Sequence, residues 1–157
     1  MKKKIIENLK TIFYALLIAL IIRSLFFQPF YIPSSSMEPT LLVGDRLFVT
    51  KYTYGYSKHS FPFSPSIFNN RFFAKQPKRG DIIVFKTPAD NRTDYIKRLI
   101  GLPGDEIQII NGNLFLNSKK ILSVKIDDDL KIYCGNDIIS TLTFKETMPS
   151  GKSYNVV

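Results

Sequence analysis

The sequence is poor in cysteine and histidine, the residues that cross-link small proteins through disulfides or metal ions. Its 157 residues include one cysteine, one histidine and no tryptophan. The single Cys134 cannot close a disulfide within the chain, and one cysteine with one histidine cannot supply the four ligands of a structural zinc site. With 8 glycines and 9 prolines, the chain is also unlike a fibrous or low-complexity protein. Disulfides, structural zinc and disorder are therefore excluded as the basis of the fold.

What the sequence has is a hydrophobic fraction of 45% and an excess of basic over acidic residues, 22 against 13. The length fits one ordinary domain. The net charge is +9, and residues 1–28 account for +4 of it because they hold five basic residues and one acidic residue. This basic cluster directly precedes an apolar run, whereas nucleic-acid binding requires a basic face on the folded part. We therefore expect a membrane partner and no nucleic acid.

The apolar run is a candidate transmembrane helix. Residues 11–22 are uncharged, but a hydrocarbon core of about 30 Å needs roughly 20 helical residues. The span must therefore include Arg23, whose long side chain can reach the outer headgroups. The lysines before the run predict a cytoplasmic N-terminus. Four aromatic residues after it are expected at the outer interface: Phe26, Phe27, Phe30 and Tyr31.

A cleaved secretory signal is the alternative interpretation, because a basic start and a short apolar run fit it equally well. Its cleavage site requires small residues, whereas residues 23–30 are mostly bulky. An uncleaved anchor is favoured for this reason. The expected organisation is a basic tip and transmembrane anchor over residues 1–28, followed by an exported domain over residues 29–157.

The exported part is predicted to be mainly β-structure. Segments 46–52, 81–86 and 95–100 are rich in β-branched and aromatic residues and are bounded by turn-forming residues. Asn111-Gly112 separates two further strand segments, 106–110 and 113–117, and this dipeptide tolerates the positive φ angles of a two-residue hairpin turn. The fold class predicted is mainly β, preceded by one transmembrane helix.

Residues 53–77 form a long aromatic connection with two possible roles. Its rings alternate with Ser, Pro, Asn and basic residues, as expected of a surface that rests on anionic lipid. The same rings could simply cover a small β core. The composition does not decide between these roles. The aromatic residues are Tyr54, Tyr56, Phe61, Phe63, Phe68, Phe72 and Phe73.

Other motifs point to no metal or cofactor. Gly151-Lys152-Ser153 resembles the end of a phosphate-binding loop, but that motif needs glycine where Glu146 stands. Three adjacent acids, Asp127–Asp129, cannot all face one cation and are more typical of an exposed bend. No metal ligands and no cofactor are predicted.

Two features remain that packing does not explain. Residues 34–36 are three serines between Pro33 and Pro39, directly after the expected anchor. The second feature is a pair of cations, Lys97 and Arg98, inside an apolar strand. Alternation places these two cations on opposite faces, and both faces are otherwise apolar. Periodicity therefore does not say which cation is buried.

These features belong to a longer pattern. Four segments, in this order and after an apolar anchor, resemble consecutive sequence boxes of bacterial type I signal peptidases, also called leader peptidases. The similarity extends over essentially the whole chain. The segments are 36–41 (SMEPTL), 44–51 (GDRLFVTK, with Tyr54-Gly55 after it), 78–85 (KRGDIIVF) and 94–105 (DYIKRLIGLPGD).

The resemblance implies a Ser-Lys dyad protease that removes signal peptides from exported preproteins. Ser36 would be the nucleophile and Lys97 the general base, which must lose its proton to accept that of Ser36. An apolar strand face disfavours the charged amine, so the resemblance assigns the buried position to Lys97. The Ser36 backbone N–H and the Ser34 hydroxyl would stabilise the oxyanion. Substrate-binding positions would be Phe30, Ile32, Met37 and Tyr95.

The same resemblance implies a place in the cell. The protein would sit in the bacterial inner membrane with a single span and a cytoplasmic N-terminus. Its catalytic domain would lie on the periplasmic face, where translocated signal peptides emerge. Ser36 comes 13 residues after Arg23, which would keep the nucleophile near the membrane surface.

One part of the family pattern is absent. A further box, Gly-Asp-Asn-Arg followed by Ser, Asp and Arg, would come after Val157, so the resemblance indicates a C-terminally truncated chain. The alternative function is a catalytically inactive relic or fragment that binds membrane or signal sequences without hydrolysis. A soluble, self-cleaving repressor-type protease with the same dyad is disfavoured, because it would need a DNA-binding region in place of the anchor.

Overall fold

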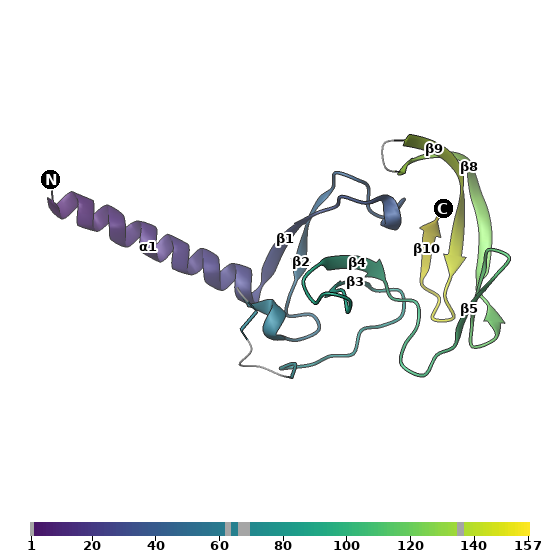
Figure 1. Cartoon of the computed structure of the whole chain (residues 1–157), viewed down its shortest axis with the longest axis horizontal. Coiled ribbons are helices and arrows are strands. Elements are labelled where there is room, and N and C mark those ends of the chain that lie inside the picture. The colour runs from purple at the N-terminus through teal and green to yellow at the C-terminus, as the bar shows by residue number, and fades with distance from the viewer. Residues whose placement is uncertain (1, 62–63, 66–69, 135–136) are drawn as a thin grey trace. The chain divides into compact units, whose positions relative to one another are not determined.

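The computed structural model describes residues 2–61, 64–65, 70–134 and 137–157. Strands dominate, and one long apolar helix opens the chain, which confirms the predicted fold class (Figure 1). The chain forms two compact units. The first unit comprises Met1–Phe30 and Leu47–Gln76, and the second unit comprises Tyr31–Arg46 and Pro77–Val157. The boundary expected at residue 28 stays a prediction.

Helix α1, Lys2–Leu25, has the length and composition of a membrane span. Its 24 residues rise about 1.5 Å each, which exceeds the roughly 30 Å of a hydrocarbon core. Side chains are exposed from Lys2 through Arg23. The helix ends at Leu25, before the predicted stop at Gln28-Pro29. Strand β1, Phe27–Tyr31, follows it and contains both of these residues. The sequence interpretation missed this strand.

The first unit folds back onto the end of α1. Strand β1 pairs with β2, Arg46–Thr50, which is two residues shorter than the predicted 46–52. The Tyr56 hydroxyl donates a hydrogen bond of 2.8 Å to the Leu25 carbonyl in the last turn of the helix. Tyr56 and Phe72 exchange backbone hydrogen bonds of 2.9 and 2.8 Å, which close the aromatic connection. Phe63 and Phe68 lie outside the described residues.

Gly55 makes this closure possible. It is buried, it has a φ of +80°, and a Cβ there would overlap the Phe72 carbonyl oxygen. Only glycine combines the positive φ with the missing side chain.

We expect Gly55→Ala to open the aromatic connection. Alanine pays about 1 kcal/mol for the left-handed conformation and must also displace the Phe72 backbone. Hydrogen exchange at the Tyr56 and Phe72 amides should accelerate. Gly112→Ala is the matched control, because Gly112 has a φ of +76° with open space around it. Equal exchange rates at these amides in the wild type and in Gly55→Ala would contradict this account.

The second unit contains the remaining sheets. Strands β3, Ile82–Lys86, and β4, Asp94–Arg98, pair antiparallel with Ile83 opposite Lys97. Strands β5, Ile107–Ile110, and β6, Asn113–Leu116, form the predicted hairpin, with φ of +49° and +76° at Asn111 and Gly112. This confirms the two-residue turn. Short β7, Lys119–Lys120, extends that sheet.

A long hairpin that the sequence interpretation missed completes the unit. Strands β8, Leu122–Cys134, and β9, Asp137–Thr147, pair antiparallel, and β10, Ser153–Val156, adds to β9. Asp127–Asp129, expected in an exposed bend, lie within β8, although their side chains lie outside those the structure describes. The core of the unit consists of Leu116, Ile121, Met148 and Tyr154.

Asp105 joins three segments of the second unit. Its carboxylate accepts hydrogen bonds from Arg79 at 2.6 Å, from the Leu102 backbone N–H at 2.6 Å and from Asn117 at 2.8 Å. Arg79 also donates to the Ile100 carbonyl at 2.8 Å. These donors, led by Arg79, hold the pKa of Asp105 well below its ordinary value. The Arg79-Gly80-Asp81 turn is thereby tied to the start of the β5–β6 hairpin.

This lowered pKa predicts acid sensitivity. A carboxyl group with a lower pKa in the folded chain contributes stability above its unfolded pKa of about 3.9 and loses it as the pH falls through the folded value. We expect Asp105→Asn to lower stability at pH 7 and to flatten its decline below pH ~4. Urea unfolding against pH measures both. Glu106→Gln, at an exposed neighbour, should leave the pH profile nearly unchanged; an unaltered profile in Asp105→Asn would refute the role of Asp105.

Candidate active site

Ser36 lies in a short 3₁₀ helix, Ser35–Met37, within the second unit. Ser34 precedes this helix in an extended conformation, and its side-chain oxygen accepts a hydrogen bond of 3.3 Å from the Ser36 backbone N–H. The serine hydroxyl satisfies a backbone donor that a helix start leaves unpaired, which is the ordinary reason for serine at this position. The three serines therefore begin a capped turn, which continues to Thr40 through a backbone hydrogen bond from Thr40 to Met37 and is called the serine turn (residues 34–40) below. The side chain of Ser36 is exposed.

Lys97 meets Ser36 from strand β4. Its Nζ donates a hydrogen bond to Ser36 Oγ, although the two residues are 61 positions apart in the chain. Pairing of β4 with β3 fixes the backbone of Lys97 opposite Ile83. The structure thus brings together the two side chains for which the sequence implies roles of nucleophile and base. An amine beside a hydroxyl is the arrangement that activates a serine for attack on a carbonyl.

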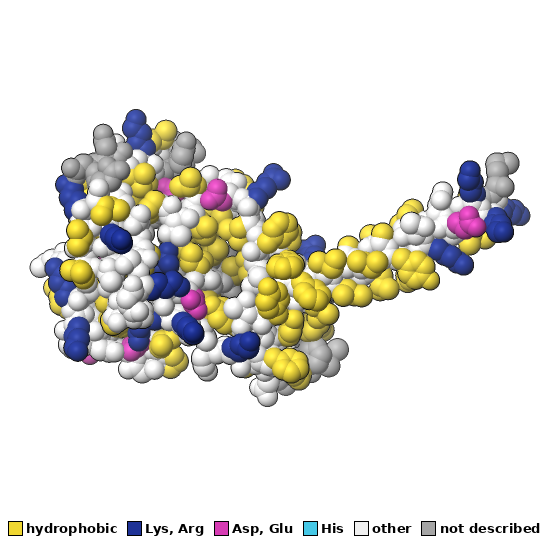
Figure 2. All heavy atoms as spheres, turned by 180° about the vertical axis from the view of Figure 1, so that it is seen from behind, with side chains coloured by type: hydrophobic (Ala, Val, Ile, Leu, Met, Phe, Trp, Pro, Cys, Tyr) yellow, Lys and Arg dark blue, Asp and Glu magenta, His cyan; other side chains and the backbone are white. Residues whose placement is uncertain are grey.

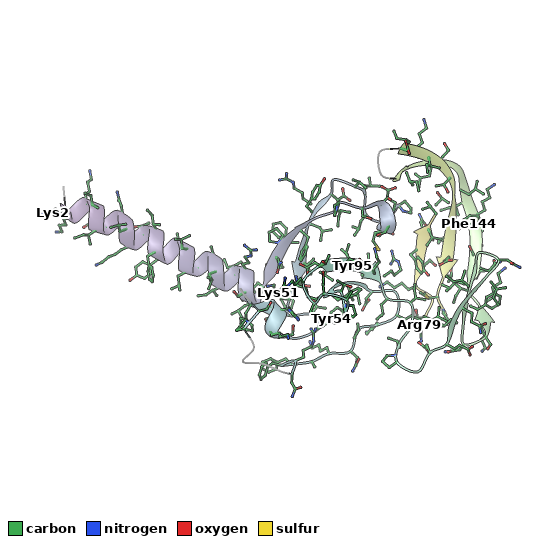
Figure 3. The ribbon with its side chains drawn as sticks, viewed as in Figure 1. Lys2, Lys51, Tyr54, Arg79, Tyr95 and Phe144 are labelled. Atoms are coloured by element: carbon green, nitrogen blue, oxygen red, sulfur yellow. The ribbon has the colours of Figure 1, made fainter. Side chains whose placement is uncertain are left out.

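The surroundings of Lys97 are less apolar than expected. The Lys97 Nζ lies 5.8 Å from the centre of the Tyr95 ring, and that ring packs edge-on against Phe85 at 6.2 Å. Tyr95 lies on β4 (Figure 3), and its side chain is exposed. Because this face of the strand is open to solvent, Lys97 is half-buried instead of buried. The buried position assigned to Lys97 was wrong.

The structure places the other implied site residues in two groups. Ile32 lies two residues before Ser34 and Met37 is the last residue of the 3₁₀ helix, and they are 2% and 7% exposed. The backbone of Ile32 is held by hydrogen bonds of 2.9 Å to Asp45 and from Gly44. Phe30 lies on β1 in the first unit and is half-buried. Substrate binding by these residues and by Tyr95 stays a prediction.

Arg98 holds the serine turn in a way that the sequence interpretation did not anticipate. Its guanidinium donates hydrogen bonds of 2.9 Å to Thr40 Oγ1 and 3.1 Å to the Gly80 carbonyl. It also lies 4.4 Å from the centre of the Tyr154 ring, in cation–π contact. Burial lowers the pKa of Arg98 from its ordinary value. The position of Arg98 directly after Lys97 in the strand was the only signal available in the sequence.

Tyr154 extends this contact to the C-terminal strand. It is buried, and its hydroxyl donates a hydrogen bond of 2.7 Å to Glu146 on β9. Burial and this hydrogen bond raise the pKa of the Tyr154 hydroxyl well above its ordinary value, so the ring stays neutral under Arg98. A continuous set of contacts therefore runs from Thr40 through Arg98 and Tyr154 to β9.

We expect Arg98→Lys to weaken the contacts with Thr40, Gly80 and Tyr154 although the substitution keeps the positive charge. Lysine cannot present the planar fork that meets Thr40, Gly80 and the tyrosine face together. A loss of about 1.5–3 kcal/mol in the free energy of unfolding is expected, as for hydrogen bonds to a charged group. Urea denaturation measures it. Arg92→Lys, at an exposed turn position, is the matched control; similar losses in both variants would show that Arg98 has no special role.

Comparison with known proteins adds to this geometry. The sequence pattern of the family described as "Signal peptidase, peptidase S26" matches residues 5–154. The chain is 45% identical over 155 residues to Signal peptidase I of Rickettsia typhi, which covers 97% of this chain and 57% of that protein. It is 48% identical over 143 residues to Signal peptidase I of Rickettsia prowazekii, covering 90% and 53%. The chain therefore spans about half the length of the curated relatives it matches.

Proposed function

The chain belongs to the signal peptidase family, peptidase S26, and from this premise we propose that it is a membrane-bound serine endopeptidase for signal peptides of exported preproteins. The observation that carries the proposal is the hydrogen bond between Lys97 Nζ and Ser36 Oγ. Both residues lie in the segments that resemble the family, and both belong to one compact unit. The proposed catalytic pair therefore depends on no arrangement between the two units.

The proposed reaction is an acyl transfer. Neutral Lys97 accepts the proton of Ser36 as Oγ attacks the carbonyl carbon of the scissile peptide bond. The C–N bond then breaks, Lys97 returns the proton to the leaving amine, and the signal peptide remains as an ester on Ser36. Water, deprotonated by Lys97, hydrolyses the ester and releases the serine. The direct contact between the two side chains supports the proton transfer between Ser36 and Lys97.

Ser34 is the proposed partner for the oxyanion. Its Oγ lies 3.3 Å from the Ser36 backbone nitrogen, so the Ser34 hydroxyl and the Ser36 N–H, the two proposed oxyanion donors, are close enough to contact one oxygen atom. The long hydrogen bond between them is weak, and an oxyanion can take the Ser36 N–H while the Ser34 hydroxyl turns to donate. Donors of this kind are typically worth about 3–4 kcal/mol of transition-state stabilisation. Ile32 and Met37 are the proposed walls for small residues before the scissile bond, with Phe30 and Tyr95 as further contacts.

Membrane anchoring is part of the proposal. Helix α1 is long and apolar enough to span a bilayer, and Lys2, Lys3, Lys4 and Lys10 favour a cytoplasmic N-terminus. In this orientation the domain that carries Ser36 is periplasmic. The ten residues between Leu25 and Ser36 restrict how far the nucleophile can lie from the membrane. A substrate presented at the membrane surface is thereby favoured.

Cleavage of a radiolabelled secretory precursor by the full chain in detergent tests the mechanism. We expect Ser36→Ala and Lys97→Ala to lower the rate by about three orders of magnitude or more, because the two groups act as a unit. Lys97→Arg should not restore it, since the guanidinium does not lose its proton. Ser35→Ala, one position from the nucleophile, is the matched control and should retain activity. Cleavage that survives Ser36→Ala would refute the mechanism.

The same assay addresses the alternative of a non-catalytic signal-sequence binder. That alternative predicts no turnover in the wild-type chain while a photo-reactive signal peptide still crosslinks to it. Turnover abolished by Ser36→Ala excludes the alternative. Crosslinking without turnover would overturn the proposed hydrolysis and leave binding as the function.

A further inference from the structure

Two strands adjoin the 3₁₀ helix that carries Ser36. One is β4, which supplies Lys97, and the other is β8. All three elements belong to the second unit, so their arrangement does not depend on the first unit. The proposed chemistry uses β4 and gives no role to β8. A strand this close to the nucleophile can contact a substrate that is bound at Ser36.

The outer part of the β8–β9 hairpin extends beyond the three-stranded sheet. Strand β10 pairs with residues 144–147 of β9, so the rest of β9 pairs with β8 alone. We call this two-stranded part, residues 130–134 and 137–142, the distal ribbon. Its pairing is regular from Leu130 opposite Thr141 to the end of β8. Within the part of the chain that the structure describes, each strand of the distal ribbon has one edge without a backbone partner.

The distal ribbon exposes hydrophobic side chains on both faces. Ile138 is 60% exposed, and Ile139, which lies directly opposite Ile132, is 46% exposed. Neighbouring residues of a strand point to opposite faces, so Ile138 and Ile139 lie on different faces of the ribbon. Leu142 is also exposed, and the core cluster of the unit contains none of these residues. Figure 2 shows hydrophobic side chains at the surface of the second unit, between basic ones.

Open strand edges beside exposed hydrophobic side chains are typical of a sheet that accepts a further strand. An extended peptide that adds to a sheet edge is held by main-chain hydrogen bonds, while its alternate side chains contact the surface beside the edge. Proteins usually cover or charge such edges, because uncovered edges pair with other chains. Binding through the main chain depends little on the peptide sequence. It therefore suits a site that accepts many different polypeptides.

We propose that the distal ribbon binds the segment of the preprotein that follows the scissile bond, while this segment is still extended and unfolded. The proposal rests on the signal peptidase function proposed above. Ile32, Met37, Phe30 and Tyr95 are the residues proposed for the signal-peptide side, so β8 is available for the other side of the substrate. A second copy of the chain could pair with an open edge, but such pairing gives no reason for β8 to adjoin the Ser36 helix. This adjacency therefore favours the substrate.

Kinetics with a long and a short substrate test the proposal. The long substrate is a secretory precursor with its mature part, and the short substrate is the same signal peptide with only the first two residues after the scissile bond. In the full chain, Ile138→Thr with Ile139→Thr should raise the KM of the long substrate about tenfold, because two apolar contacts are lost. The KM of the short substrate and both kcat values should stay unchanged, because the dyad is untouched.

The matched control is Ile109→Thr with Ile110→Thr. These two isoleucines are also neighbours in a strand of the second unit, β5, and are 75% and 47% exposed. The control variant should leave both KM values unchanged. An equal rise in KM for both substrates in the ribbon variant would overturn the proposal, as would an unchanged KM for the long substrate. A rise of the same size in the control variant would also overturn it.

Crosslinking provides a measurement that needs no turnover. The Ser36→Ala chain is mixed with a precursor that carries a photo-reactive residue about five positions after the scissile bond, which reaches about 16 Å along an extended chain. We expect a crosslink to the distal ribbon, located by mass spectrometry. If the wild type cleaves neither substrate but this crosslink forms, the proposed hydrolysis fails and the binding surface stands. Cleavage without the crosslink overturns the binding surface alone, and absence of both overturns both proposals.

A lysine-specific crosslinker tests the second copy. Lys131 lies in the distal ribbon and is exposed. If two ribbons pair with each other, the crosslinker should join Lys131 of one chain to Lys131 of another in the substrate-free protein. This product would identify a second copy as the occupant of the ribbon and would overturn the proposal. We expect Lys131 to react without joining two chains.

Discussion

Two consecutive cations on β4 have different partners, and the serine turn depends on both. Lys97 reaches Ser36 and Arg98 reaches Thr40, so one short strand contacts the turn at two points four residues apart. Alternation along a strand points neighbouring side chains to opposite faces, so Lys97 can contact the exposed Ser36 while the half-buried Arg98 packs against the ring of Tyr154. A change of one residue in the pairing of β3 with β4 would exchange the two roles.

The interior of the second unit supports that strand indirectly. Asp105 gathers Arg79, the Leu102 amide and Asn117, which ties the entry to β3 and the exit from β4 to the β5–β6 hairpin. Tyr154 belongs at once to the buried core and to the contact with Arg98. Stability and positioning are therefore not separable here. A substitution far from Ser36 can loosen the serine turn through these side chains.

The first unit differs from the second because it exposes several of its aromatic rings. Its rings are held outward by backbone and side-chain hydrogen bonds around Gly55, Tyr56 and Arg71, whereas a soluble domain would bury them. The charge is arranged in the same sense, because nearly all carboxylates are in the other unit. Within residues 53–77, Phe72 and Phe73 are exposed, so these two rings do not cover a β core.

The sequence by itself determined the elements whose signals are local. The apolar helix, the Asn111-Gly112 hairpin and the strands of residues 81–86 and 95–100 follow from short-range patterns, and the ordered boxes around Ser36 and Lys97 identify the family. Local patterns did not reveal β1, the long β8–β9 hairpin or the contacts of Arg98 with Thr40 and Tyr154. Long strand pairings and side-chain contacts of this kind depend on residues distant in the chain. Alternation alone left the choice between Lys97 and Arg98 open, the family resemblance pointed to Lys97, and the tertiary structure shows its contact with Ser36. Alternation separates the two side chains, but the direction of each face is set by packing against the rest of the unit.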